Sequence, residues 1–174
     1  VQTYMDQMKK PVVAALNGLA MGGGLEVALR CHSMVAMEDA ILQFPEITLG
    51  ILPGIGGCVV PYRKWPRGAD LFHEMICFGK PLKAREAVDI GMVAKLSDDH
   101  EDLIKRAIAE VTNLQGKVME IPAGKVDIPP IVIPDPPMAG NQKLSREAVD
   151  ITARTIQKGA ATEDLAAALE IGYE

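Results

Sequence analysis

The sequence predicts an α/β fold, because short apolar runs typical of strands alternate with segments of helical periodicity. The run at 12–16 leads into a glycine-rich turn at 17–24 and then into a helical pattern that ends near Cys31. Two further strand-like runs follow, at 33–37 and 41–44, before the next helical pattern begins. Alternation of this kind is typical of strand–helix units that pack around one core.

The 174-residue chain is long enough for one sizeable core, and its composition argues against several functional classes. Its net charge of −5 argues against nucleic-acid binding, which needs a basic surface. We expect no membrane span, since no apolar run approaches the required ~18 residues, and no signal peptide. Cys31, Cys58 and Cys77 lack zinc or CxxC spacing, which favours a reduced, cytoplasmic thiol state over a disulfide framework.

The first half of the chain is expected to hold short elements separated by glycine and proline signals. The segment at 45–57 is too rich in both residues to be regular, so we expect it to wrap around something. The expected elements are, in order, a short helix over 2–9, a buried strand over 11–16, the central helix over 22–31, strands over 33–37 and 41–44, the irregular segment, and a helical turn over 58–65 broken at Pro61.

The second half is expected to be mainly helical. Apolar residues at 3.6 spacing predict a helix capped by Asp98 or Asp99 and ending near Gly116. These apolar residues are Leu103, Ile104, Ala107, Ile108 and Val111. The remaining expected elements are a helix over 67–78 with Leu71, Met75 and Phe78 on one side, a helix over 83–90, a strand over 92–96, and two helices, one from Ser145 to about 158 and one from Thr162 onward.

The composition changes after residue 120. Six prolines lie between residues 121 and 137, which predicts an extended connecting segment. We therefore divide the chain into a core over 1–120, a proline-rich connecting segment over 121–143 and a C-terminal helical region over 144–174.

The stretch from Asn17 to Glu26 is the candidate for a functional site. It carries a strand into the start of a helix, where the first N–H groups lack an intrahelical partner and the dipole favours negative charge. Three successive glycines, Gly22 to Gly24, leave no Cβ in the way of a ligand atom. The stretch therefore predicts a place for an anion or a developing oxyanion.

Two common phosphate-binding motifs are excluded here. Val27 stands where the dinucleotide pattern needs its third glycine, and Leu25-Glu26 stands where a phosphate loop needs Lys-Ser/Thr. A carboxylate in the first helical turn would repel a phosphate, but not a substrate whose negative charge appears only in the transition state.

Two motifs carry a resemblance to a known family. Asn17-Gly-x-Ala-x-Gly-Gly-Gly-x-Glu26 and Phe44-Pro45-Glu46-x-x-x-Gly50-x-x-Pro53-Gly54-x-Gly56-Gly57 resemble the crotonase superfamily, and within it enoyl-CoA hydratase. The similarity continues through 79–87 to 91–93 and covers roughly residues 9–96. It implies a spiral of ββα units followed by a C-terminal helical region that packs in a homo-oligomer, a trimer or a dimer of trimers.

The resemblance also implies roles at matched positions. Glu26 is expected to be the base that holds water, Glu46 the acid, and the Gly23 N–H an oxyanion donor. Gly22, Gly54 and Gly57 are expected to bind substrate. We expect no metal ion and no cofactor, since coenzyme A is part of the substrate. Two carboxylates in one dry site do not both ionise easily, so one pKa should be raised.

The activity implied is hydration of α,β-unsaturated acyl-CoA thioesters in fatty-acid or related acyl-CoA breakdown. Isomerisation and a catalytically silent assembly domain are the alternatives, and the presence of both Glu26 and Glu46 favours hydration. The resemblance further places an N-terminal section, with a second oxyanion donor, before Val1. We therefore expect this chain alone to hydrate poorly, and its parent to be a longer, bifunctional polypeptide.

Other reactive residues have simpler interpretations. Cys58 could be activated at a helix start, but a buried, inert thiol is the commoner case. His73 and His100 are interpreted as surface or helix-flank residues. The basic cluster of Arg63, Lys64 and Arg67 could meet CoA phosphates, although an ordinary charged surface is the default interpretation.

Overall fold

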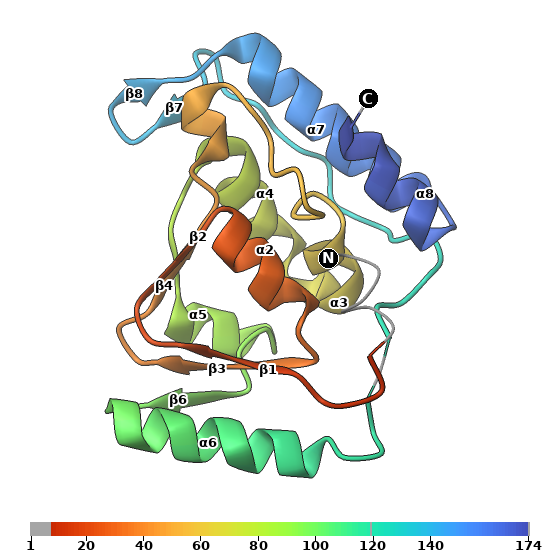
Figure 1. Cartoon of the computed structure of the whole chain (residues 1–174). Helices are drawn as coiled ribbons and strands as arrows, with labels where there is room; N and C mark the ends of the chain where they lie inside the picture. Colours follow the sequence, from red (N-terminus) through yellow and green to blue (C-terminus); the bar gives the residue numbers. More distant parts are fainter. Residues whose placement is uncertain (1–7, 119, 174) are drawn as a thin grey trace.

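The fold comes from a computed structural model that describes residues 8–118 and 120–173 (Figure 1). The first elements are β1 (Val13–Leu16), β2 (Leu19–Met21), α2 (Gly23–Arg30), β3 (Ser33–Met37), β4 (Ile41–Gln43) and the 3₁₀ helix η1 (Glu46–Leu49). The middle elements are α3 (Val60–Lys64), η2 (Pro66–Gly68), α4 (Ala69–Phe78), β5 (Leu82–Lys83), α5 (Ala84–Asp89), β6 (Lys95–Ser97) and α6 (His100–Asn113). The last are β7 (Met138–Ala139), β8 (Gln142–Lys143), α7 (Arg146–Ala161), α8 (Leu165–Glu170) and η3 (Ile171–Tyr173).

The strands of the core form two small sheets, which the strands β1 to β4 join alternately. One sheet has the order β1-β3-β6 and is entirely parallel, while the other has the order β2-β4-β5. In the second sheet β2 and β4 are parallel, and β5 runs antiparallel to β4. Each passage of the chain therefore adds one strand to each sheet, first as β1 and β2, then as β3 and β4.

The core lies between these sheets and the helices that cover them. Helix α6 packs on the β1-β3-β6 sheet, and α2 lies on the other side of that sheet (Figure 1). The largest side chains that are fully buried include Leu25, Leu29, Met34, Leu42, Phe44, Tyr62, Phe72, Met75 and Ile76. They come from β3, β4, α2, α3 and α4, except Phe44, which directly follows β4, and α2 contributes Leu25 and Leu29 from two successive turns.

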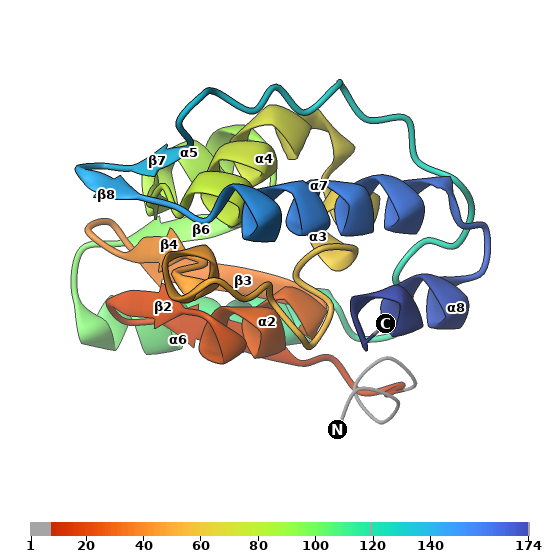
Figure 2. The ribbon, with the colours of Figure 1, turned by 90° about the horizontal axis from the view of Figure 1, so that it is seen from above.

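The C-terminal part folds back over this core. Residues 120–137, which we call the strap, have no regular secondary structure and run along one side of the molecule towards β7 (Figure 2). Helix α7 then returns along α4 and is followed by α8. The strap is bonded to the end of α7, because Gly124 N donates to Glu163 O and Val126 N donates to Ala160 O, both at 2.8 Å.

Several sequence predictions need correction. Pro61 does not break a helix, since it lies in the first turn of α3, where its missing N–H would have no partner. The strand expected at 92–96 forms only from Lys95 to Ser97. Strands β2 and β5 were not predicted; they are two or three residues long and exist because β4 lies between them. Residues 2–7 of the helix expected over 2–9 lie outside the described residues.

Two helices bury different faces from those expected. In α4 the predicted Leu71 and Phe78 are only partly buried, and His73 is buried rather than at the surface, because α4 packs against both the core and α7. In α6 only Leu103 is fully buried, whereas Ile104 and Ile108 are exposed, because they lie at the edge of a wide apolar stripe.

Candidate active site

The glycine turn and the first turn of α2 form one wall of the site. Gly22 has a left-handed φ of 52°, and its N–H donates to Gln43 O of the neighbouring strand at 3.0 Å. Helix α2 therefore begins at the end of the β2-β4 pair, with Gly23 as its first residue. The Gly23 N–H is one of the first-turn groups that has no intrahelical acceptor, so it can donate to a ligand.

Glu26 lies one turn further along α2 and is almost completely buried, with 3 % of its surface exposed. Its Oε1 accepts hydrogen bonds from Ile55 N at 2.7 Å and from Gly57 N at 2.8 Å. The N–H groups of the turn at 53–57, which we call the carboxylate turn, thus face the site, as the sequence predicts. Within the part of the chain that the structure describes, no hydrogen bond is made to Oε2 of Glu26, so this oxygen can accept from a ligand.

The carboxylate turn is packed so tightly that it needs glycine at two positions. Gly56 has a φ of 111°, and a Cβ there would lie 2.9 Å from Arg30 Nη2 and 3.0 Å from Leu169 Cδ2 of α8. A Cβ on Gly57 would lie 2.7 Å from Pro53 Cβ and 2.9 Å from the Phe44 ring. The turn is therefore held from α2 on one side and from α8 on another.

Glu46, the first residue of η1, faces Gly22 across the site. A Cβ on Gly22 would lie 2.8 Å from Glu46 Oε1, so the glycine lets the carboxyl group approach the backbone. Glu46 Oε2 is shielded from solvent and accepts no hydrogen bond from the described residues. Burial raises the pKa of Glu46, and the nearby Glu26 carboxylate raises it further, against the opposing effect of its own backbone N–H.

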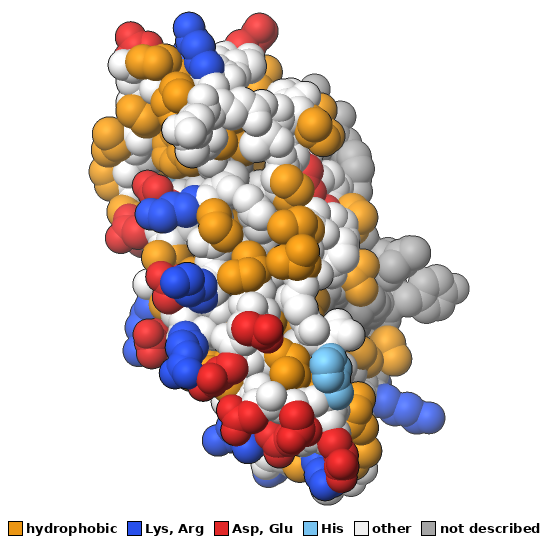
Figure 3. All heavy atoms as spheres, turned by 90° about the vertical axis from the view of Figure 1, so that its left-hand side faces the viewer, with side chains coloured by type: hydrophobic (Ala, Val, Ile, Leu, Met, Phe, Trp, Pro, Cys, Tyr) orange, Lys and Arg blue, Asp and Glu red, His pale blue; other side chains and the backbone are white. Residues whose placement is uncertain are grey.

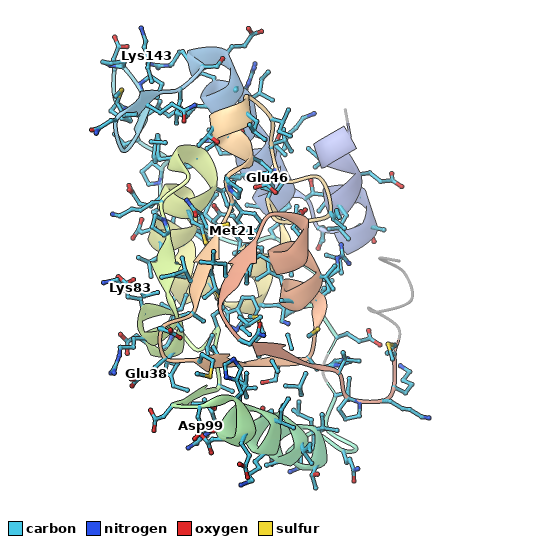
Figure 4. All side chains as sticks on the ribbon, turned by 60° about the vertical axis from the view of Figure 1, so that its left-hand side comes forward. Met21, Glu38, Glu46, Lys83, Asp99 and Lys143 are labelled. Atoms are coloured by element: carbon cyan, nitrogen blue, oxygen red, sulfur yellow. The ribbon has the colours of Figure 1, made fainter. Side chains whose placement is uncertain are left out.

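The structure brings together most of the residues proposed from the sequence. Glu26, Glu46, Gly22 and Gly23 meet where α2 begins, and Figure 4 shows Glu46 and Met21 at this end of the molecule, far from Glu38 and Asp99. The Gly57 N–H is directed at Glu26, and Gly54 lies exposed in the same turn. The predicted roles of these residues are not tested by the geometry alone.

Apolar side chains surround the opening of the site. Met21, Val27, Leu49, Ile51 and Ile55 are all more than a third exposed, although each lies on or beside the elements that carry the two glutamates. A cavity of about 340 Å³ runs along residues 15–21 and reaches Gly24. Figure 3, which faces β2 and β4, shows apolar side chains gathered over the middle of this face.

Sequence reasoning missed two contributors to the site. The first is the Ile55 N–H, because a backbone donor has no residue signature beyond the surrounding glycines. The second is Arg30, which is 3 % exposed and donates from Nε to Ile55 O at 3.2 Å. A basic residue in the last turn of a helix is ordinarily interpreted as a solvated charge that favours the dipole, so its burial could not be foreseen.

The cysteines take no part in this chemistry. All three are free and buried, and burial raises the pKa of Cys58 well above that of an ordinary thiol. Burial likewise raises the pKa of Cys77 to about 12. Cys58 is therefore a protonated, inert thiol, which confirms the simpler interpretation of this residue.

The basic cluster at 63–67 proves to be largely structural. Arg63 is buried and donates to four backbone carbonyls, those of Pro122, Gly124, Gly159 and Thr162. Lys64 donates to Leu29 O and Cys31 O at the end of α2. Of the three side chains only Arg67 is exposed, so both the CoA-phosphate and the charged-surface interpretations are wrong for Arg63.

Across residues 8–118 and 120–173, no three His, Cys, Asp or Glu side chains gather as they would around a metal ion. Helices long and apolar enough to cross a membrane are likewise not found in this part of the chain.

A comparison with protein families places the site in a known context. The family model described as Enoyl-CoA hydratase/isomerase matches residues 1–123, which include both glutamates and the carboxylate turn. The chain belongs to this family. The prediction of a crotonase-type α/β fold, made from the two glycine-containing motifs, is thereby confirmed.

Individual relatives agree with this assignment. A Bacillus subtilis protein named "Probable enoyl-CoA hydratase" is 40% identical over 107 residues, covering 60% of this chain and 40% of its own. The cucumber (Cucumis sativus) glyoxysomal fatty acid beta-oxidation multifunctional protein MFP-a is 44% identical over 109 residues, covering 62% of this chain and 14% of its own.

Among solved structures, the Geobacillus kaustophilus protein described as "Enoyl-CoA Hydrates Subunit I" superposes with a TM-score of 0.59 and 26% identity. The superposition covers 99% of this chain and 55% of that one. The chain thus spans less than two thirds of the length of each of these three relatives.

Proposed function

We propose that the protein carrying this chain hydrates α,β-unsaturated acyl-CoA thioesters in fatty-acid or related acyl-CoA breakdown. One observation supports this most directly: two carboxyl groups share a site beside the Gly23 N–H, and their surroundings differ. Glu26 accepts two backbone N–H bonds at one oxygen, whereas burial raises the pKa of Glu46. Paired carboxyls whose environments separate their proton affinities are the usual arrangement for one acid and one base.

The reaction can be written with each group in one role. Glu26 Oε2 accepts a proton from water as the water oxygen bonds to Cβ of the substrate. The electron pair of the C=C bond moves to Cα and the thioester oxygen, where the Gly23 N–H stabilises the developing negative charge. Protonated Glu46 then delivers its proton to Cα. The sum is the addition of one water, after which a proton passes from Glu26 back to Glu46.

The proton transfers written above use the two glutamates, the Gly23 N–H, water and the thioester. Coenzyme A enters as part of the thioester, so we propose no separate cofactor and no metal ion. The exposed apolar side chains around the site, including Leu49 and Ile51, suit contact with an acyl chain or with a neighbouring subunit. We propose that the protein assembles as a homo-oligomer, a trimer or a dimer of trimers, in the cytoplasm.

Hydration of crotonyl-CoA by the protein that carries this sequence tests the proposal. Glu26→Gln and Glu46→Gln should each lower kcat by about 10²–10⁴, the usual contribution of acid–base catalysis. Glu38→Gln is a matched control that should leave kcat unchanged, because Glu38 directly follows β3, pairs with Arg85 and lies away from Glu46 (Figure 4). Near-normal hydration by either site variant removes that glutamate from the mechanism, and turnover of a 3-enoyl-CoA to a 2-enoyl-CoA without hydration favours an isomerase instead.

A further inference from the structure

Arg30 reaches the carboxylate turn from the same helix that carries Glu26. We propose that Arg30 is a positioning residue, which fixes the backbone of Ile55 so that the Ile55 and Gly57 N–H groups meet the Glu26 carboxylate. The inference deepens the proposed function, because it concerns how the water-holding carboxylate is kept in place.

The geometry of two hydrogen bonds carries the argument. Glu26 and Arg30 are four residues apart and therefore lie on one face of α2. Glu26 Oε1 accepts from Ile55 N at 2.7 Å, and Arg30 Nε donates to Ile55 O at 3.2 Å. These bonds lie on either side of the Ile55 α-carbon, so together they fix both backbone dihedrals of that residue relative to α2. Neither peptide can rotate while both bonds are present.

The packing of Gly56 supports the same role. Its position lies so close to Arg30 Nη2 that a Cβ there would be 2.9 Å away. The guanidinium group therefore occupies space that a side chain at Gly56 would need. A buried cation is costly unless it is paired and hydrogen-bonded, and here the position of the guanidinium is set by the turn that holds Glu26.

Arg30 is not needed to complete the end of α2. Lys64 already donates to Leu29 O and Cys31 O, at 2.9 and 2.6 Å, and so satisfies carbonyl groups of the last turn. In the bonds described here the two cations have different acceptors, since Lys64 bonds carbonyls at the end of α2 and Arg30 bonds the Ile55 carbonyl of the carboxylate turn. This difference supplies a matched control, because Lys64→Met disturbs α2 without touching the turn.

The experiment follows backbone amides of the 174-residue chain by NMR, which needs no catalytic turnover. Arg30→Met should increase hydrogen exchange at Ile55 and Gly57 by about tenfold or more, since these amides are protected by hydrogen bonds to the charged Glu26 carboxylate and the turn that presents them would be released. Exchange at Val35, in the central strand of the first sheet, should remain unchanged. Lys64→Met should leave both turn amides as in the wild type, and Arg30→Lys, which keeps a cationic donor, should give an intermediate result.

A second readout links the effect to Glu26. Glu26→Gln should move the chemical shifts of the Ile55 and Gly57 amides together, because both bond the same carboxylate oxygen. In an Arg30→Met background the same substitution should no longer move the two amides together.

Several results would overturn the positioning role of Arg30. Unchanged turn amides in Arg30→Met, or a rise in exchange that is equally large at Val35, would overturn the positioning role and leave Arg30 as a structural residue. If Arg30→Met does not fold, Arg30→Lys decides, because a folded lysine variant with fully wild-type exchange at Ile55 and Gly57 overturns the proposal. If the wild-type protein does not hydrate crotonyl-CoA but the amide changes predicted for Arg30→Met are observed, only the proposed function is contradicted.

Discussion

The carboxylate turn at 53–57 and the strap at 120–137 are both irregular, and each is held by one buried charged side chain. The side chain is an anion, Glu26, for the turn and a cation, Arg63, for the strap. The turn directs two N–H groups at the Glu26 carboxylate, whereas the strap directs two carbonyls, of Pro122 and Gly124, at the Arg63 guanidinium. Backbone groups removed from water need partners, and a charged side chain can satisfy several at once.

The difference lies in what remains after these bonds are made. The Arg63 guanidinium also bonds Gly159 O and Thr162 O, so four carbonyls from the strap and the end of α7 surround it. Glu26 takes both of its N–H bonds at Oε1, and its second oxygen faces a site that contains another carboxyl group. The Arg63 guanidinium therefore serves to hold the fold together. Glu26 also holds its turn, but its Oε2 accepts no hydrogen bond from the described residues and can accept one from a ligand.

The largest effect should come from breaking the strap. Arg63→Met removes a donor that bonds four carbonyls, two of them at 2.6 and 2.7 Å, and should lower the free energy of unfolding by about 3 kcal/mol. Urea unfolding measures this change. Arg67→Met is the control, because Arg67 is exposed a few residues away and its loss should cost less than about 0.5 kcal/mol. Equal effects of the two substitutions would show that the strap does not depend on Arg63.

A smaller effect should come from crowding the turn. Gly57→Ala places a Cβ 2.7 Å from Pro53 and 2.9 Å from Phe44, and such overpacking should cost about 1–3 kcal/mol in thermal or urea unfolding. Gly54→Ala is the control within the same turn, since no atom lies within 4 Å of its Cβ position. The idea of a tightly packed turn fails if both alanine variants unfold alike.

The smallest effect should appear in the pH dependence of stability. Because the pKa of Glu46 is raised in the folded state, ionising it costs stability as pH rises, and the cost is absent below the ordinary glutamate pKa of ~4.3. Glu46→Gln should therefore be more stable than the wild type at pH 7, and this advantage should vanish near pH 4. Urea midpoints at the two pH values measure the change.

Asp102 provides a control of opposite sign. A hydrogen bond from Arg106 lowers the pKa of Asp102, so its ionised form stabilises the folded state above the ordinary aspartate pKa. Asp102→Asn should be less stable than the wild type at pH 7, and the difference should disappear as pH falls through the lowered pKa. If both variants shift stability in the same direction, the environment ascribed to Glu46 is incorrect.

The sequence predicts the helices and the site carboxylates well, because their signals are local. Asp99, one of the two residues expected to cap α6, does so; α7 begins next to Ser145, where a helix was expected to start; and the glycines before Glu26 open α2. The two-residue strand β5 lacks a local signal, because only its pairing with β4 makes it a strand. The buried face of α6 was predicted too wide, since periodicity does not show which edge of a stripe meets the sheet.

The basic residues show why the rest of the site could not be predicted. Arg30 and Arg63 both stand where a solvated charge is the ordinary interpretation, and both are buried against backbone groups of segments distant in the sequence. Nothing near either residue in the sequence marks the carbonyl that it bonds. Such contacts are fixed by the path of irregular chain, which is set by tertiary packing rather than by local preference.

The contact between Gly56 and Leu169 has a mechanical consequence. Leu169, on α8, lies so close to the Gly56 position that even a methyl group would not fit between them. Helix α8 and Gly56, which lies in the turn that bonds Glu26, are therefore in direct contact. A movement of α8 towards the core, such as the docking of another subunit or of a further domain could cause, would therefore press on the turn that bonds Glu26. Binding at the outer surface of α8 and the position of the Glu26 carboxylate are thus linked through Gly56, whose lack of a side chain allows the close contact.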